Sequence, residues 1–216
     1  MDEALTYGGS IRRLLWVGEA ELYRGHLLRL DGESRRNRFG GAVSDDFIRR
    51  YCEPSALSGA IIYGFFVDGV LRGAAELRLL EPAGDAEVAL SIERTWQSQG
   101  VGTALLEHLL LAAGNRGIDR LHMLCLAENG RMRQLARKFD AELSIQSGSV
   151  VGEMKAPHPT PMSVMRELVA DSADLALAML HVPSQLAKRL ERMNGRPEHR
   201  QQDPRCDRLM LVDNWR

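Results

Sequence analysis

The sequence predicts an α/β fold in which a mixed, mostly antiparallel central sheet is flanked by helices. Two runs rich in β-forming residues surround Asp68-Gly69, which indicates a hairpin because glycine readily adopts positive φ. An apolar helix at 99–115 separates two strand-like segments, 84–93 and 119–127. A strand–helix–strand unit of this kind forms a right-handed parallel crossover. One parallel pair beside an antiparallel meander gives a mixed sheet.

The residues before the hairpin predict a strand, a helix, a break and a short helix, at 11–17, 18–30, 31–41 and 44–52. Apolar residues recur near helical spacing in the first helix. Ser44 or Asp45 is a natural cap for the second, because their side-chain oxygens accept hydrogen bonds from the free amides of the first turn. The hairpin itself occupies 58–80.

The residues after the crossover predict a shorter helix and a closing hairpin around Gly148, at 129–139 and 141–156. A further helix begins at Thr160-Pro161, with threonine as cap and proline in the first turn. Its apolar stripe comprises Met162, Met165, Leu168, Val169, Leu175, Met179 and Leu180. We interpret this stripe as a packing surface, on the protein's own core or across a dimer, rather than as a binding groove. The predicted organisation is a domain at 8–156 and a helical and polar extension at 157–216 that could form a homodimer.

Composition excludes several classes of partner. With 216 residues, 44% of them hydrophobic, the chain can bury a real core. The net charge of −1 argues against bulk attraction to nucleic acid or to an anionic membrane, and no run of eighteen apolar residues occurs. The acidic first ten residues lack a secretory pattern, and three irregularly spaced cysteines fit reduced thiols. We therefore expect a cytoplasmic protein without nucleic-acid or membrane partners, and without a metal site, since no CxxC or HExxH motif is present.

The informative motif is Gln97-x-x-Gly100-x-Gly102, which lies where a strand leads into the helix at 99–115. Glycines let the backbone turn tightly and approach a ligand closely. The helix start offers unpaired amides and the positive end of the helix dipole, a combination that binds pyrophosphate. Two glycines at a helix start are common by themselves, and the motif is neither a Walker loop nor GxGxxG. The preceding strand, the buried helix and the strand and helix that follow favour the phosphate interpretation.

The segment AEVALSIERTWQSQGVGTALLEHLLLAAGNRGIDRLHMLCLAENGRMRQLARKFDAEL (86–143) resembles the acetyl-coenzyme A core of the GCN5-related N-acetyltransferases, the GNAT family. A shorter likeness, LRLDGESRRNRF (28–39), is to the catalytic domains of bacterial protein-lysine acetyltransferases. The resemblance implies a GNAT-like fold and an enzyme that moves an acetyl group from acetyl-CoA to a primary amine. It leaves open whether the acceptor is a protein lysine or a small-molecule amine.

The resemblance also assigns residues to acetyl-CoA: Leu90, Ser91, Ile92, Gln97, Gln99, Gly100, Val101, Gly102, Thr103 and Asn129. The backbone of 90–92 would face the pantetheine arm at a splay between this strand and the strand at 119–127. The amides of 99–103 would hold the pyrophosphate in a loop shaped by Gln97. Asn129 would contact the coenzyme from the second helix.

One position departs from the family. A tyrosine often stands seven residues after that asparagine and protonates the departing thiolate, but here the residue is Ala136. A coenzyme thiol has a pKa of about 8.5, so its thiolate leaves tolerably well without a dedicated acid. An alternative hypothesis follows from the same departure: the domain binds acetyl-CoA but serves as a sensory or interaction module with weak catalysis.

The acceptor amine must lose a proton before it attacks, since a free lysine has a pKa of about 10.4. We expect Glu87 to be the general base, because it lies on the strand before the loop in an AEVAL context that resembles the catalytic glutamate of protein-lysine acetyltransferases. Partial desolvation beside the cleft would raise its pKa. The alternative for Glu87 is a solvated carboxylate or an ion pair with an arginine. Glu76 is the rival base, unless it pairs with Arg78 or Arg72.

Three further sets of residues receive other interpretations. Glu93 is a third carboxylate, expected to be exposed at the strand end. Cys125 lies in an apolar run, where a thiol stays protonated, so direct transfer in a ternary complex is favoured over an acetyl-cysteine. The arginine cluster near Phe39 could meet an acidic acceptor or the adenosine phosphate, but a solvated loop is favoured; its members are Arg35, Arg36 and Arg38.

Overall fold

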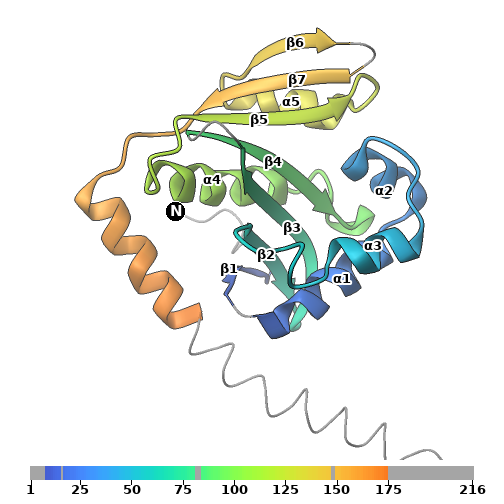
Figure 1. The fold of residues 1–216 in the computed structure, drawn as a ribbon, viewed down its shortest axis with the longest axis horizontal. Coiled ribbons are helices and arrows are strands. Elements are labelled where there is room, and N and C mark those ends of the chain that lie inside the picture. Colours follow the sequence, from blue (N-terminus) through green and yellow to red (C-terminus); the bar gives the residue numbers. More distant parts are fainter. Residues whose placement is uncertain (1–7, 16, 81–83, 147–148, 175–216) are drawn as a thin grey trace, which may run out of the picture. The chain divides into compact units, whose positions relative to one another are not determined.

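The computed structural model describes residues 8–15, 17–80, 84–146 and 149–174, all within the compact unit Met1–Ala178. The described strands form a seven-stranded sheet in the order β1-β2-β3-β4-β5-β7-β6 (Figure 1). They are β1 (Ser10–Leu14), β2 (Ile61–Val67), β3 (Val70–Leu79), β4 (Asp85–Ile92), β5 (Arg120–Leu126), β6 (Glu142–Gln146) and β7 (Ser149–Lys155). Neighbouring strands are antiparallel except β4 and β5, which are parallel. The predicted fold class is confirmed.

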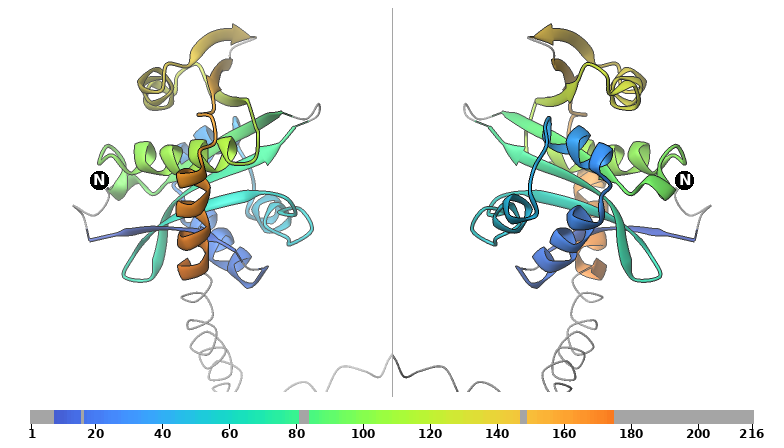
Figure 2. Two further views of the ribbon diagram at one scale, coloured as in Figure 1. Left: turned by 90° about the vertical axis from the view of Figure 1, so that its left-hand side faces the viewer. Right: turned by 90° about the vertical axis from the view of Figure 1, so that its right-hand side faces the viewer.

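Helices cover both faces of the sheet (Figure 2). They are α1 (Ala20–Arg29), α2 (Gly32–Phe39), α3 (Asp45–Tyr51), α4 (Val101–Gly114), α5 (Gly130–Lys138) and a helix at 161–174. Alternate residues of β2 enter two different cores: Tyr63 belongs to the core under α4, whereas Ile62 belongs to the core under α1 and α3. This alternation follows from the period-two geometry of a strand.

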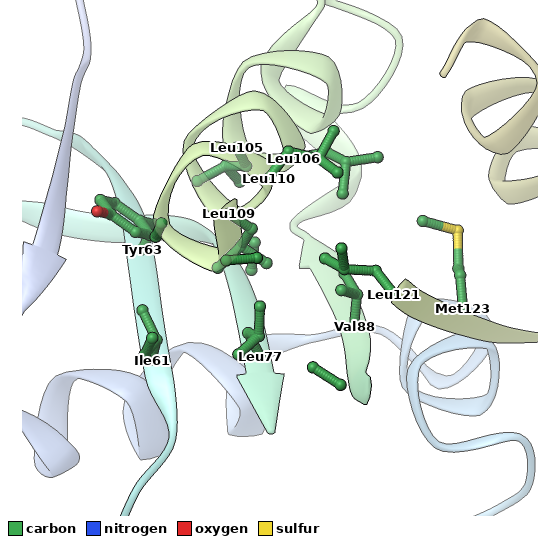
Figure 3. Packing of buried hydrophobic residues seen from close by; sticks show 14 of the residues in the cluster. Ile61, Tyr63, Leu77, Val88, Leu105, Leu106, Leu109, Leu110, Leu121 and Met123 are labelled. Atoms are coloured by element: carbon green, nitrogen blue, oxygen red, sulfur yellow. The ribbon is translucent and has the colours of Figure 1, made fainter. Parts of the chain in front are cut away.

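The larger core lies between α4 and the middle of the sheet. Figure 3 shows the leucines of α4 packed over β2, β3 and β4. Leu105, Leu106 and Leu109 are fully buried, and Leu77 and Val88 face them from the strands. The breadth of this buried surface explains why nearly every position of the helix is apolar in the sequence. The buried helix fixes where its first turn meets the end of β4.

The predicted break at 31–41 is wrong, because residues 32–39 form α2. Asp31 caps this helix: its side chain accepts hydrogen bonds from the amides of Glu33 and Ser34 at 3.1 Å each. Gly40, at φ 70°, ends it in the left-handed conformation. The polar composition suggested a loop, but the Asp cap and the C-terminal glycine are ordinary helix boundaries.

Most other predicted elements are confirmed. The hairpin turns at Asp68 and Gly69, both at positive φ, and Ser44 caps α3 by accepting from the amide of Phe47. Thr160 caps the helix at 161–174 by accepting from the amide of Ser163 at 3.0 Å. The first strand is shorter than predicted and ends at Leu14. The predicted turn at Gly148 lies outside the described residues, although β6 and β7 pair as expected.

The helix at 161–174 is held by carboxylates that meet β1 and the end of α4. Glu167 accepts hydrogen bonds from Asn115 and Arg116 at 2.6 Å each. Asp171 pairs with Arg13 at 2.6 Å. These contacts attach the start of the predicted extension to the sheet domain.

The apolar stripe of this helix does not pack on the core. The exposed side chains in the described part are Met162, Met165, Leu168 and Val169, between 58% and 74% exposed. The prediction that these residues pack on the protein's own core is therefore wrong, while packing across a dimer stays a prediction. Leu175, Met179 and Leu180 lie outside the described residues.

The described ranges contain neither a candidate membrane span nor a candidate metal site. None of the helices there combines the length and the apolar composition that a membrane span requires. The same residues contain no cluster of three or more His, Cys, Asp or Glu side chains suited to a metal ion.

Candidate functional site

β4 and β5 separate soon after they begin. The two strands pair at Asp85–Arg120, Ala86–Leu121 and Glu87–His122 and then diverge (Figure 1). β4 nevertheless continues to pair with β3 as far as Ile92. The backbone from Val88 to Ile92 therefore has one edge in the sheet and the other edge without a β5 partner.

A cavity of about 690 Å³ opens at this separation. A volume of this order is typical of small-molecule sites. Its walls come from α2, β4, the loop before α4, the start of α4, and α5. The lining residues are Ser34, Asn37, Arg38, Leu90, Ser91, Ile92, Gln97, Ser98, Gly100, Gly102, Thr103, Asn129, Arg131, Met132, Gln134, Leu135, Arg137 and Lys138.

The first turn of α4 faces this cavity without a side-chain cap. Gly100 is the N-cap, at φ 81°, and no side chain in the described part of the chain caps the helix start. The amide of Ala104 makes the first intrahelical bond, to the carbonyl of Gly100 at 3.1 Å. The amides that precede it are the free donors of a helix N-terminus, and the helix dipole adds positive potential there. This end of α4 is suited to an anionic group.

Gly102 keeps the cavity wall open. A Cβ atom at this position would lie 3.3 Å from Cδ1 of Ile92 and 3.7 Å from Cδ2 of Leu135. The space above the glycine is thus bounded by β4 on one side and α5 on the other. Gly102 adds no side chain of its own to this wall, and the side chains of Ile92 and Leu135 flank it closely.

The structure brings together eight of the ten residues assigned to the coenzyme. Those that line the cavity are Leu90, Ser91, Ile92, Gln97, Gly100, Gly102, Thr103 and Asn129. The other two do not line it. Val101 points into the core and is 1% exposed, and the side chain of Gln99 donates to the carbonyl of Thr95 at 2.7 Å.

Gln97 ties the loop to its surroundings. Its Nε2 donates to the carbonyl of Ile92 at 2.8 Å and to Oγ of Ser34 at 3.0 Å. Its Oε1 accepts from Arg131 at 2.7 Å. The side chain thereby joins β4, α2 and α5, which agrees with a residue that shapes the loop.

Asn129 has a structural task that the sequence did not reveal. Its Oδ1 accepts a hydrogen bond from the amide of Met132 at 3.1 Å and so caps α5. The residue also lines the cavity. Its Nδ2 group makes no hydrogen bond within the described residues and can donate to a ligand.

Sequence reasoning missed the contributions of α2 and α5 to the cavity. On α2 the omission followed from the predicted break. On α5 only Asn129, at the start of the helix, was assigned to a ligand, and the basic side chains that border the cavity were not. Arg131, Arg137 and Lys138 add positive charge to the wall, which favours a phosphorylated ligand.

Glu76 is buried in a network of ion pairs and hydrogen bonds. Its side chain is 1% exposed; Oε2 accepts from Tyr23 at 2.7 Å and Tyr51 at 2.6 Å and pairs with Arg38, while Oε1 pairs with Arg78 at 2.6 Å. Burial alone raises the pKa of Glu76, but these partners outweigh burial and hold the pKa below its usual value. A carboxylate so occupied is a weak proton acceptor, which supports its structural pairing with Arg78.

Glu87 lies on the neighbouring strand and is exposed, contrary to the expected partial desolvation. It stands opposite Arg78 on β3 and His122 on β5. Among the described residues no ion pair or hydrogen bond engages its carboxylate. Glu87 borders a small cavity of about 20 Å³, and Arg38 lines both this cavity and the larger one.

Glu93 is not exposed, so that prediction is wrong. Its side chain is 13% exposed and lies within 3.4 Å of His26, 2.9 Å of Arg29 and 3.0 Å of Arg72. Burial raises its pKa, but the hydrogen bonds from these three groups outweigh burial and lower the pKa of Glu93 to about 2. The carboxylate is ionised at neutral pH.

The structure also shows the partners of the arginine cluster and the burial of Cys125. Arg35 and Arg36 pair with Asp45 and Glu128, but Arg38 is 7% exposed and pairs with Glu76, so a solvated loop is wrong for Arg38. Cys125 is 5% exposed, and burial raises the pKa of its thiol. The thiol is therefore a poor nucleophile, as expected.

The position of the missing tyrosine lies in the core. Ala136 is 2% exposed, belongs to the cluster under α4, and is not among the residues that line the cavity.

Comparison with known proteins agrees with this geometry. A model of the acetyltransferase (GNAT) family matches residues 28–140, more than half of the chain. The GNAT domain of S. lividans PAT superposes with a TM-score of 0.59 at 23% identity, over 68% of this chain and 90% of that domain. The PaiA N-acetyltransferase from Thermoplasma acidophilum, solved in complex with coenzyme A, gives 0.53 at 19% identity, over 68% of this chain and 99% of that one.

The ribosomal-protein-S18-alanine N-acetyltransferase from Escherichia coli gives a TM-score of 0.53 at 14% identity, over 71% of this chain and 97% of that one. At these identities the solved structures establish a shared fold.

Proposed function

The chain belongs to the acetyltransferase (GNAT) family, and from this premise we propose that it transfers an acetyl group from acetyl-CoA to a primary amine, directly and within a ternary complex. The observation that carries the proposal is the uncapped head of α4, which opens on a cavity of about 690 Å³. The acceptor is a protein lysine or a small-molecule amine.

Two parts of acetyl-CoA, the pyrophosphate and the pantetheine arm, have suitable groups in the cavity. The free amides at the start of α4 suit the pyrophosphate, because backbone donors and the helix dipole both favour an anion. The unpaired edge of β4 offers backbone groups from Leu90 to Ile92 to the amide-containing pantetheine arm. The fit rests on Gly102 and on the cationic side chains of α5.

Glu87 is the proposed general base. It takes a proton from the acceptor ammonium, directly or through water, so that the neutral amine attacks the thioester carbonyl. Its carboxylate is exposed and has no described partner, whereas both oxygens of Glu76 are occupied. Backbone amides of β4 would stabilise the oxyanion that forms.

No side chain is assigned as the acid. Ala136 occupies the tyrosine position and lies in the core. The coenzyme departs as a thiolate, which a thiol pKa of about 8.5 permits.

The second candidate is a binding module that holds acetyl-CoA with weak catalysis. The absence of a tyrosine at position 136 favours it. Calorimetry with acetyl-CoA detects binding under either candidate, while free-thiol release that increases when an amine from a panel is added occurs only for the enzyme. Binding without thiol release for any amine would select the module; absence of binding would reject both.

The proposal also covers the cellular location and the oligomeric state of the protein. The free cysteines Cys52 and Cys125 support a reducing, cytoplasmic location. The exposed stripe of the helix at 161–174 supports a homodimer, which sedimentation of the full chain would test.

A further inference from the structure

A buried histidine connects α1 to the wall of the cavity. His26 is 0% exposed; its Nε2 lies 3.0 Å from Oγ of Ser91 and its Nδ1 lies 3.4 Å from Oε1 of Glu93. Arg29 and Arg72 hold the Glu93 carboxylate in place. A hydroxyl, an imidazole and a carboxylate thus form one chain of hydrogen bonds.

The carboxylate determines the state of the imidazole. Glu93 is ionised and only accepts hydrogen bonds, so Nδ1 of His26 carries the proton that faces it. Burial lowers the pKa of His26 more than Glu93 raises it, which keeps the ring neutral. Nε2 then has a free lone pair and accepts the hydrogen of the Ser91 hydroxyl. This is the arrangement that prepares a serine for nucleophilic attack.

Ser91 is 5% exposed and borders the proposed acetyl-CoA cavity. It is on β4 beyond the last pair with β5 and lines the large cavity. Its side chain faces the α1 side of the sheet, and Ser34 and Asn37 of α2 line the cavity as well.

We propose that Ser91 is a second acyl acceptor, with His26 as its base and Glu93 as the residue that positions His26. The inference rests on the proposed binding of acetyl-CoA, but not on transfer to an amine. Oγ of Ser91 bonds to the acetyl carbonyl carbon while its proton passes to Nε2 of His26. The carbon–sulfur bond then breaks, and the coenzyme thiolate takes that proton. The products are O-acetyl-Ser91 and free coenzyme A.

The acetyl-serine is resolved by water when no amine is present. The oxygen of water bonds to the ester carbonyl carbon while one of its protons passes to Nε2 of His26. The bond between that carbon and Oγ of Ser91 then breaks, Oγ takes the proton from His26, and acetic acid leaves and ionises to acetate. The protein therefore hydrolyses acetyl-CoA slowly in the absence of an acceptor.

Mass spectrometry of the full chain tests the proposal. After incubation with acetyl-CoA and no amine, we expect one acetyl group per chain, located on Ser91 by peptide mapping. Ser91→Ala abolishes the adduct, and His26→Gln slows its formation about 100-fold, the typical loss of a general base. Ser91→Cys restores an adduct, now a thioester. Ser144→Ala, on β6 and outside the cavity lining, leaves the adduct unchanged.

The outcomes separate this inference from the proposed function. If calorimetry detects acetyl-CoA binding but the wild-type protein carries no acetyl group on Ser91, or carries it on Ser34 or a lysine instead, the inference is overturned and amine transfer stands. If acetyl-CoA does not bind, both are overturned. The wild-type mapping needs no variant, so a Ser91→Ala protein that fails to fold does not affect the result.

Discussion

Arg38 on α2 and Glu76 on β3 form a buried ion pair between side chains that are 7% and 1% exposed. The same arginine lines the large cavity, and the same glutamate also accepts from Tyr23 and Tyr51. The pair fixes α2, which supplies one wall of the cavity, to the sheet.

Replacement of Arg38 by leucine leaves the Glu76 carboxylate buried without its main cation. We expect the free energy of unfolding to fall by about 3–5 kcal/mol, the usual cost of removing one partner of a buried pair. Urea denaturation followed by circular dichroism measures it. Arg36→Leu on the same helix is the control, because its pair with Glu128 is exposed and its loss should change stability little. Equal effects of the two variants would contradict the structural role of Arg38.

Glu87→Gln should lower turnover about 100-fold or more, because the neutral amide cannot take the ammonium proton. Coenzyme affinity should stay nearly constant, since Glu87 does not line the large cavity. Free-thiol release and calorimetry measure the two quantities. Glu153→Gln, on β7 opposite His122, is the matched control. An unchanged rate in Glu87→Gln would transfer the role to Glu76 or to water.

Gly102→Glu should weaken acetyl-CoA binding about tenfold or more, because it places a carboxylate where the α4 amides would meet the pyrophosphate. Gly102→Ala tests the effect of added volume without added charge. Its Cβ would lie 3.3 Å from Cδ1 of Ile92, a contact that a small shift relieves. We expect the alanine variant to bind far better than the glutamate variant in calorimetry. Unaltered affinity in Gly102→Glu would remove the basis for the loop assignment.

The stability of the protein should fall as the pH drops below about 6.5. His26 has a lowered pKa in the folded state because it is buried, so the unfolded chain takes up a proton at a pH where the folded chain does not. The contribution of neutral His26 is complete above the unfolded pKa of about 6.5 and is lost as the pH falls toward the folded pKa. Urea denaturation between pH 8 and 5 should show a flatter profile for His26→Gln than for the wild type. Parallel profiles would contradict this role.

Ala136→Tyr should not restore an acid. Ala136 is buried beside Gly152, so a phenol ring there overpacks the core and we expect a loss of about 1–3 kcal/mol in stability. Thermal denaturation and thiol release measure stability and turnover, with Ala136→Ser as the smaller control. A stable Ala136→Tyr protein with faster turnover would show that the position reaches the reacting thioester after all.

Much of the fold could be predicted because its signals are local. Asp68-Gly69 marks the hairpin, Ser44 marks the start of α3, and the apolar pattern of α4 marks a buried helix. The glycine motif also predicted which helix end would face the cavity. Each of these features depends on neighbours within a few residues.

The parts that could not be predicted depend on distant partners. Glu93 looked like an exposed strand end, but it is buried because His26 and Arg29 on α1 reach it from more than sixty residues away. Arg38 looked like one charge of a solvated run, yet its partner Glu76 lies on another element. No periodicity in the sequence records such pairings. The prediction of a break at 31–41 was wrong for a different reason. Asp31 was present in the sequence as a possible helix cap, but the polar composition of the segment was given more weight.

The short parallel pairing between β4 and β5 limits how firmly the two parts of the sheet are joined. Three residue pairs join the β1–β4 part of the sheet to the β5–β7–β6 part. Beyond these pairs, the edge of β4 that faces β5 has backbone donors and acceptors without a β5 partner. In the proposed complex, the pantetheine arm would hydrogen-bond to the edge of β4 that β5 leaves unpaired. We therefore expect acetyl-CoA to connect the two parts of the sheet as well as to supply the acetyl group.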